Sequence, residues 1–234
     1  MKIVAVSPHL DDAAFSVGGA LAVLADRGHE VTVVTCFTGS VVAPTGFALA
    51  CQTDKGLAPE VDYMAVRRAE DDAALAVLGV TPLQLPLLEA PHRGYLSASA
   101  LFAGVRADDL IWHDVVRSLG DLEADLWLAP QGLGSHVDHL QVVRAVVALG
   151  RPTAWWRDAP YVLRRPDAAA SPDLPKGLTR LVLPADRDRR ADACACYATQ
   201  LSFQFGGPEQ LRQALADLDE VVLADVGAAA ILQP

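Results

Sequence analysis

The fold is decided near the start of the chain, where residues 2–37 read KIVAVSPHLDDAAFSVGGALAVLADRGHEVTVVTCF. Residues 2–7 form a short apolar run, which predicts a buried strand. The spacing becomes helical from Phe15 to Arg27, and Gly28 ends that helix. Residues 30–37 are rich in Val and Thr, which predicts a second strand. Strand, helix and strand over this length are typical of a parallel βαβ unit.

The rest of the chain continues this alternation. Further strands are expected at 83–88, 125–130, 153–156, 178–183 and 221–226, and further helices at 63–78, 108–119, 136–149, 186–200 and 208–218. Gly79 is expected to cap the first of these helices, and Ser135 to be the N-cap of helix 136–149. Irregular segments are expected at 38–62, 89–105 and 157–177. The sequence predicts an α/β fold, a single Rossmann-like domain over 1–234 with a mostly parallel sheet flanked by helices.

Composition limits the partners. The chain has 234 residues and a net charge of -10, and 52% of its residues are hydrophobic. This length and apolar content allow a full core. The acidic balance argues against nucleic acid and against an anionic membrane surface, because both require clustered Lys and Arg.

The same inspection gives an expected location. No stretch has the length of a charge-free transmembrane helix, and no signal peptide is recognisable, so we expect a cytoplasmic protein. The four cysteines are expected to be reduced in a chain of this size. The sequence leaves the formation of a homo-oligomer open.

Two clusters of metal-ligating residue types follow expected strands. Residues 7–12 read Ser-Pro-His-Leu-Asp-Asp after the first strand, and residues 136–139 read His-Val-Asp-His after the strand that ends at Pro130. Ligands bind beyond the carboxyl ends of the strands in sheets of this kind, so we expect the two clusters to meet at one edge. Each motif alone has an ordinary explanation, because an Asp pair often caps a helix and a His-x-x-His pair often lies on a surface.

Together the clusters predict a metal-dependent hydrolase. His9, Asp12 and His139 supply two imidazoles and one carboxylate, a ligand set that suits zinc with one open position. Iron(II) tolerates similar ligands, so another divalent metal stays open. Asp11 is expected to be the general base. His136 is expected to stabilise an oxyanion or protonate the leaving amine, and Asp138 to orient an imidazole.

These motifs resemble the PIG-L/LmbE-like zinc-dependent de-N-acetylases. The opening family motif, Ala-His-Pro-Asp-Asp-Glu, is matched by residues 8–13, and the later His-Pro-Asp-His by residues 136–139. Residues 67–70 match an Arg-x-x-Glu motif, and residues 158–161 resemble an Asp-x-Pro-Tyr segment. Leu10 and Val137 replace the usual prolines and Ala13 replaces the usual Glu, but all ligand types are retained.

The resemblance implies hydrolysis of an N-acyl group, usually acetyl, from a small amino sugar or a related amide. It implies the same zinc ligands, base and oxyanion-stabilising residue, and it places Arg67 at a substrate-contacting position. The alternative for Arg67 is a surface ion pair with Glu70. His92 stands where some members have an acidic residue near the sugar. It either contacts substrate, assists the metal shell or is a solvated loop residue. Tyr161 is expected to line the pocket, and residues 41–62 to shape one wall of it.

Three other interpretations stay open. A metal-dependent amidase or esterase of different acyl specificity would use the same ligands. A metal-binding but catalytically silent relative would keep them without turnover. A non-catalytic nucleotide-binding Rossmann module would bind nucleotide without metal, although Gly18-Gly19 is not a dinucleotide-binding fingerprint.

Overall fold

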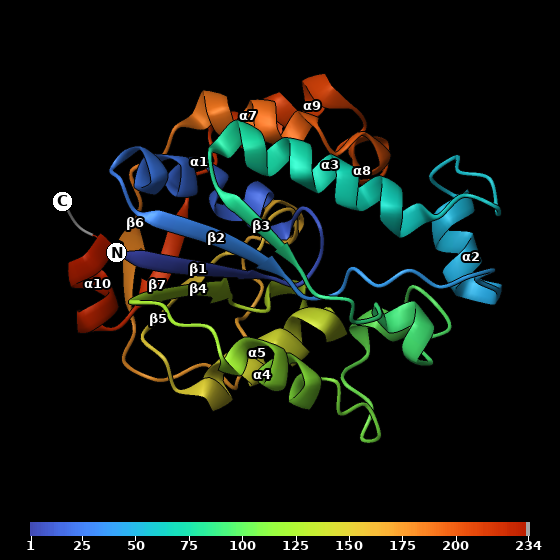
Figure 1. The fold of residues 1–234 in the computed structure, drawn as a ribbon, viewed down its shortest axis with the longest axis horizontal. Coiled ribbons are helices and arrows are strands. Elements are labelled where there is room, and N and C mark those ends of the chain that lie inside the picture. The colour runs from blue at the N-terminus through green and yellow to red at the C-terminus, as the bar shows by residue number, and fades with distance from the viewer. Residues whose placement is uncertain (233–234) are drawn as a thin grey trace.

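The computed structural model describes residues 1–232, and it contains one seven-stranded sheet in the order β3-β2-β1-β4-β5-β7-β6 (Figure 1). The strands are β1 (Lys2–Ser7), β2 (Glu30–Thr35), β3 (Thr81–Gln84), β4 (Leu126–Pro130), β5 (Thr153–Trp156), β6 (Thr179–Val182) and β7 (Val221–Ala224). The first five strands pair in parallel, and β7 pairs antiparallel with both β5 and β6. The predicted α/β class with a mostly parallel sheet is confirmed.

Helices cover both faces of the sheet. The α-helices are α1 (Asp12–Asp26), α2 (Gly46–Thr53), α3 (Tyr63–Leu78), α4 (Trp112–Gly120), α5 (Val137–Leu149), α6 (Tyr161–Arg164), α7 (Arg187–Ala195), α8 (Ala198–Gln204), α9 (Pro208–Ala216) and α10 (Val226–Leu232). Short 3₁₀ turns are η1 (Ala90–Arg93), η2 (Ala100–Phe102) and η3 (Leu133–Ser135). Figure 1 shows α1, α3 and α7 over one face, and α4 and α5 over the other.

The core alternates along each strand, as the two-residue period of a β-strand requires. Ile3 and Ala5 of β1 belong to the apolar cluster under α1 and α3, whereas Val4 and Val6 belong to the cluster under α4 and α5. The central strands are therefore apolar on both sides. No helix within residues 1–232 is long and apolar enough to cross a membrane.

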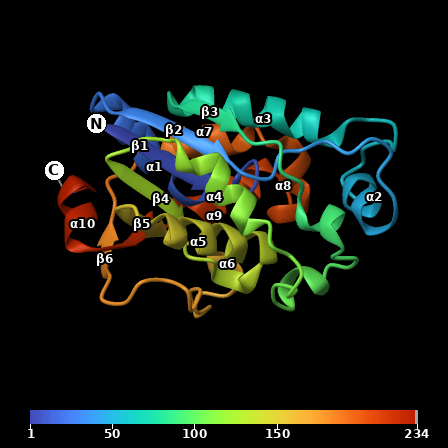
Figure 2. The same cartoon turned by 60° about the horizontal axis from the view of Figure 1, so that its bottom comes forward.

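The sheet order positions the functional segments. From β1 the chain proceeds outward through β2 and β3 on one side, and through β4 and β5 on the other. The boundary between β1 and β4 is thus a topological switch point, where ligands of doubly wound sheets bind at the carboxyl edge. Residues 8–12 and 131–139 both leave the sheet there, and Figure 2 shows the segment around α2 beyond the same edge.

Most expected elements are present, with shifted ends. Helix α3 and its left-handed cap Gly79 match the prediction. Helix α1 begins at Asp12 rather than Phe15, because residues 8–11 turn tightly enough for the helix to start at once. Strand β3 ends at Gln84, and α4 begins at Trp112. Helices α2, α6 and α10 lie in segments where no helix was predicted.

Two local predictions are wrong. Ser135 is not the N-cap of α5; it lies in η3 with φ +63°, and His136 is the cap, since its ring accepts a hydrogen bond from the Asp138 N–H. The helix predicted over 186–200 is interrupted between Ala195 and Ala198. The break at Tyr197 lets its buried hydroxyl donate to Asp71 on α3 (2.8 Å).

A kink in α1 explains the Gly18-Gly19 pair. At Val17 the backbone leaves the helical region, and the N–H groups of Gly19 and Ala20 donate to the buried Glu220 carboxylate (3.0 and 2.7 Å). A Cβ on Gly19 would lie 2.6 Å from the Asp186 carbonyl oxygen. The pair therefore allows a close backbone approach, which depends on Gly19.

Candidate metal centre

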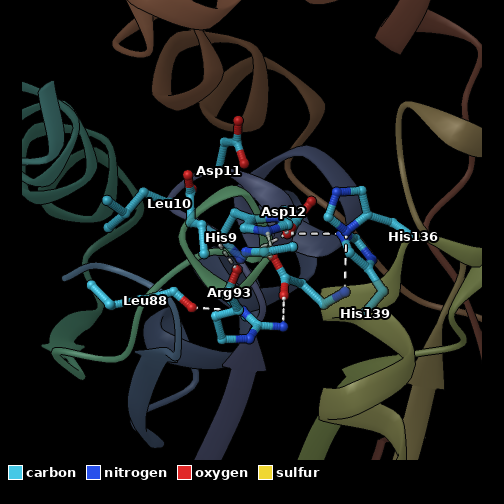
Figure 3. A network of polar contacts seen from close by, with 12 residues as sticks. His9, Leu10, Asp11, Asp12, Leu88, Arg93, His136 and His139 are labelled. Atoms are coloured by element: carbon cyan, nitrogen blue, oxygen red, sulfur yellow. Dashed lines mark hydrogen bonds and ion pairs between the residues drawn. The ribbon is translucent and has the colours of Figure 1, made fainter. Parts of the chain in front are cut away.

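Three side chains converge at the carboxyl edge of β1 and β4 (Figure 3). Asp12 Oδ2 lies 3.1 Å from His9 Nδ1 and 3.2 Å from His139 Nε2. His9 comes from the turn after β1, Asp12 from the first turn of α1, and His139 from the first turn of α5. Asp12 and His139 are buried, and the His9 side chain is 13% exposed, so a ligand can reach the cluster from the His9 side.

The second nitrogen of each imidazole is held by another carboxylate. His9 Nε2 lies 2.9 Å from Asp138 Oδ2, and His139 Nδ1 lies 2.7 Å from Asp158 Oδ1. If each imidazole donates its N–H to this carboxylate, the lone pairs of His9 Nδ1 and His139 Nε2 both face Asp12. Three acceptors then converge, and the buried His139 Nε2 has no hydrogen-bond partner. Such an arrangement fits a cation bound between the three residues.

The electrostatics favour positive charge at this point. Burial alone would lower the pKa of His139, but Asp12 and Asp158 raise it to about 9. Burial would likewise lower the pKa of His9, yet hydrogen bonds to Asp12 and Asp138 raise it well above its ordinary value. Protons and a metal ion would therefore compete for the same nitrogens.

Asp158 is a functional residue to which the sequence analysis gave no role. It follows β5, and its Oδ2 accepts the backbone N–H groups of Gln131 (3.0 Å) and Leu133 (3.1 Å). The carboxylate is thereby fixed and directed at His139. The signal for it in the sequence is an acidic residue just after the strand next to β4, at the edge where ligands bind.

A second group, formed by His9, His136 and Asp138, also has its ligand atoms within 4.8 Å of one another. Two of its acceptors, His136 Nδ1 and Asp138 Oδ2, already take part in hydrogen bonds, and Asp138 Oδ1 faces Arg93. His136 Nδ1 accepts the Asp138 N–H (3.2 Å), and the Asp138 carboxylate contacts His9, the Ala90 N–H (3.1 Å) and Arg93 (2.7 Å). In the first group the facing nitrogens of His9 and His139 contact Asp12 alone, so this group is the better candidate metal centre.

His136 is presented as a neutral donor. Because Nδ1 accepts a backbone N–H, the ring hydrogen is placed on Nε2. Burial lowers the pKa of His136 to about 3, although Asp138 opposes this. The ring lies perpendicular to that of His9, with 5.0 Å between centroids, so it borders the convergent cluster.

Asp11 is buried, but it makes none of the contacts that join the three convergent residues. Its carboxylate lies 3.6 Å from Arg67 and stands apart from them in Figure 3. Its φ of +153° is one that L residues rarely adopt, and strain of this kind clusters at functional sites. Burial raises the pKa of Asp11 to about 7, Arg67 opposing and Asp12 adding to the rise.

The ion pair between Arg67 and Glu70 that was one alternative is not formed. The buried Arg67 guanidinium instead contacts Glu89 (2.6 Å) and the Leu10 carbonyl (3.2 Å), as well as Asp11. Glu70 accepts hydrogen bonds from the N–H and hydroxyl of Thr199. Arg67 thus supports the turn that carries Asp11, and its contact with substrate stays a prediction.

The remaining predicted residues lie around the cluster. Tyr161 opens α6, and its ring is perpendicular to that of His139 with 5.3 Å between centroids. His92 is half-buried on η1, the turn whose Ala90 and Arg93 contact Asp138. The sequence analysis missed Phe102, which is 45% exposed and lies 5.3 Å from the His136 ring. Phe102 is an apolar side chain left at the edge of the site.

The fold and this cluster define a class: a Rossmann-like α/β protein with a His-Asp-His cluster, a candidate metal centre, at the switch point of its sheet. The chain belongs to the PIG-L family, because the model of that family, described as GlcNAc-PI de-N-acetylase, matches residues 4–149. The family that the motifs indicated is thereby confirmed.

Similarity to individual proteins supports the same family assignment. The chain is 34% identical over 168 residues to 2'-N-acetylparomamine deacetylase of Streptomyces fradiae, a match that covers 68% of this chain and 57% of the relative. The chain thus spans less than two thirds of that curated relative.

Solved structures match over more of their length. A zinc-inhibited form of teicoplanin deacetylase Orf2 has a TM-score of 0.79 at 26% identity, covering 95% of this chain and 97% of that one. The A40926 pseudoaglycone deacetylase Dbv21 has a TM-score of 0.77 at 32% identity, covering 95% and 96%.

Proposed function

We propose that this chain is a metal-dependent hydrolase that removes an N-acyl group, first of all acetyl, from a small amino sugar or related amide. The observation that carries the proposal is the convergence of His9 Nδ1, His139 Nε2 and Asp12 Oδ2, with each imidazole backed by a carboxylate. Relatives named as deacetylases of 2'-N-acetylparomamine, of teicoplanin and of the A40926 pseudoaglycone support the deacetylase activity. We take residues 1–234 as one catalytic domain and zinc as the first candidate metal.

The metal ligands and the surrounding residues would divide the chemistry. A zinc ion held by His9, Asp12 and His139 would polarise the amide carbonyl and lower the pKa of a water molecule. Asp11 accepts the proton that the attacking water loses. Its pKa, raised by burial to about 7, suits a general base at neutral pH. Its pairing with Arg67 (3.6 Å) helps to keep the carboxylate in place.

His136 acts on the developing oxyanion. Its Nε2–H is available as a hydrogen-bond donor because Nδ1 is occupied by the Asp138 N–H. A ring whose pKa is lowered to about 3 stays neutral, so it stabilises negative charge by donation rather than by giving up a proton. The proton for the leaving amine then comes from Asp11. Tyr161 and His92 are proposed to contact the substrate.

The test separates metal binding from turnover. Wild type, Asp11→Asn and His139→Ala are purified, their metal content is measured, and acetate release is followed on N-acetyl amino sugars. We expect one equivalent of metal in wild type and in Asp11→Asn, with turnover of the latter lower by about 10²- to 10⁴-fold. His139→Ala should lose both metal and activity.

The outcomes discriminate the alternatives. Normal turnover by Asp11→Asn would show that Asp11 is not the base. Stoichiometric metal with activity only on other acyl groups or esters would identify a different acyl specificity, and metal without any turnover a silent relative. Nucleotide binding that is indifferent to chelators, in a protein without metal, would exclude the hydrolase.

A further inference from the structure

Arg93 lies at the centre of a buried polar cluster beside the metal site. Its Nη1 donates to the Leu88 carbonyl (2.6 Å), and its Nε and Nη2 donate to the two oxygens of Asp109 (3.3 and 2.9 Å). Nη2 also lies 2.7 Å from Asp138 Oδ1. The side chain is 10% exposed, and its guanidinium lies 5.0 Å from the Phe37 ring centroid. All three guanidinium nitrogens are thus engaged inside the protein, so Arg93 has no nitrogen without a protein partner to offer a substrate.

The partner Asp138 is fully buried, and its two oxygens have different tasks. Oδ2 accepts the Ala90 N–H and faces His9 Nε2, whereas Arg93 is the one ion-pair partner of Oδ1 within residues 1–232. Ala90 and Arg93 are the first and last residues of η1. One short turn therefore contacts both oxygens of the carboxylate, Oδ2 by a hydrogen bond and Oδ1 by the ion pair alone, and this favours the observed rotation.

The orientation of Asp138 decides which nitrogen of His9 is free. With Oδ2 fixed 2.9 Å from Nε2, His9 donates Nε2–H and keeps the Nδ1 lone pair towards Asp12. If Asp138 rotates, this tautomer loses its support. Partners behind a ligating imidazole are typically worth a factor of 10 to 100 in metal affinity.

Asp109, which accepts hydrogen bonds from Arg93, connects Arg93 to the rest of the fold. It accepts the Tyr95 hydroxyl (2.9 Å), and its backbone carbonyl accepts Gln141 Nε2 (2.7 Å). Gln141 lies on α5, the helix that carries Asp138 and His139. The irregular segment 88–109 is thereby fastened to the metal centre at Arg93 and to α5 at Asp109.

We propose that Arg93 is a positioning residue that holds Asp138 against His9, and that through it the 88–109 segment sets the affinity and geometry of the metal centre. This inference rests on the proposed function, since it requires His9 to ligate a metal. Nothing in it requires Arg93 to touch the substrate, which distinguishes it from a binding residue on the same loop.

The experiment measures metal binding rather than activity alone. Apoprotein of wild type, Arg93→Met and Arg93→Lys is titrated with Zn²⁺ and Co²⁺ against a competing chelator, and the visible spectrum of bound Co²⁺ is recorded. We expect Arg93→Met to raise the Kd about 10- to 100-fold and to alter the Co²⁺ spectrum. Arg93→Lys should recover part of the affinity, because an ammonium can pair with Asp138 but cannot also hold both oxygens of Asp109.

A control lies on the same segment. Arg106 is 46% exposed, pairs with Asp108 and donates to the Gly94 carbonyl (2.9 Å), but it forms no ion pair with Asp138. Arg106→Met should therefore leave the Kd within about twofold of wild type. Asp109→Asn loosens Arg93 without removing it, and should weaken metal binding less than Arg93→Met does. This variant and Arg93→Lys keep the test decisive if Arg93→Met does not fold.

The outcomes separate this inference from the proposed function. Folded Arg93 and Asp109 variants with the wild-type Kd and Co²⁺ spectrum would overturn it, even if their melting temperatures fell. Wild type that binds metal and releases acetate would meanwhile leave the proposed function standing. Wild type that binds no metal would overturn both.

Discussion

Replacing Asp158 by Asn tests the candidate metal centre at the buried carboxylate behind His139. The carboxylate is an acceptor on both sides: Oδ1 faces His139 Nδ1, and Oδ2 accepts the N–H groups of Gln131 and Leu133. An amide has the same shape but one donor end. If its oxygen faces His139, its NH₂ opposes two backbone donors; if it is flipped, its NH₂ opposes the imidazole N–H. Neither orientation satisfies all the donors.

Both orientations have a measurable effect. Leaving buried backbone donors without an acceptor should lower the free energy of unfolding by about 1–3 kcal/mol. The flipped amide would favour the His139 tautomer with hydrogen on Nε2, the nitrogen needed for the metal. We therefore expect the metal Kd to rise by about 10- to 100-fold, which corresponds to about 1.4–2.8 kcal/mol of binding free energy.

Chelator competition gives the Kd, and urea unfolding of the apoprotein gives the stability. Asp173→Asn is the matched control, because that carboxylate forms only a long, exposed ion pair with Arg144 (3.7 Å) and should change neither quantity by more than a few tenths of a kcal/mol. A folded Asp158→Asn protein with the Kd of wild type would refute the assignment of His139 Nε2 as a ligand atom supported by Asp158.

Three further predictions concern the core and the edge of the site. Burial raises the pKa of Asp71 to about 6, so the contribution of the protonated carboxyl group to stability is present below pH about 4 and is lost as pH rises through about 6. In urea unfolding between pH 4 and 7, the free energy of unfolding of Asp71→Asn should therefore rise by about 2–3 kcal/mol relative to that of wild type. The absence of such a rise would contradict this prediction. Gly19→Ala should lower the free energy of unfolding by about 1–3 kcal/mol, because the added Cβ would lie 2.6 Å from a backbone oxygen. Gly18→Ala should not lower it, because there the nearest atoms to the added Cβ are side-chain atoms at 3.5 Å. Equal effects of the two substitutions would count against the close approach at Gly19. Phe102→Ala removes the half-exposed ring beside His136. In steady-state kinetics this variant should show a KM for an N-acetyl amino sugar about 2- to 10-fold higher at similar kcat. An unchanged KM would exclude a contact between Phe102 and the substrate.

Local patterns predicted the elements that depend on local interactions. The βαβ unit, the left-handed cap at Gly79 and the position of both clusters after parallel strands follow from period and turn chemistry. The local pattern gave a wrong prediction where a contact with a residue far away in the sequence determines the backbone conformation. Residues 186–200 are helical in spacing, yet the chain breaks at Tyr197 because its hydroxyl reaches Asp71, 126 positions away. No local signal contains that information.

The site divides in the same way. The convergence of His9, Asp12 and His139 was predictable because each belongs to a compact motif at a strand end. Arg93 and Asp158 were not assigned, because their meaning depends on partners that the fold brings together, as in the pair of His9 and Asp138, which are 129 positions apart. Once the order of the strands is known, an acidic residue after β5 becomes a candidate, and Asp158 is that residue.

The distribution of charge indicates where the cation belongs. Each arginine at the site is committed to acidic groups outside the convergent point: Arg67 to Glu89 and Asp11, and Arg93 to Asp109 and Asp138. Asp12 and Asp158 form no ion pair with an arginine or lysine within residues 1–232, and both contact His139. His139 thus lies between two carboxylates that have no arginine or lysine partner within residues 1–232. Asp138, the neighbour of His136, instead shares the positive charge of Arg93 with Asp109. Of the two groups of possible ligands that share His9, the one with Asp12 and His139 therefore offers a bound cation more carboxylate charge without an arginine partner.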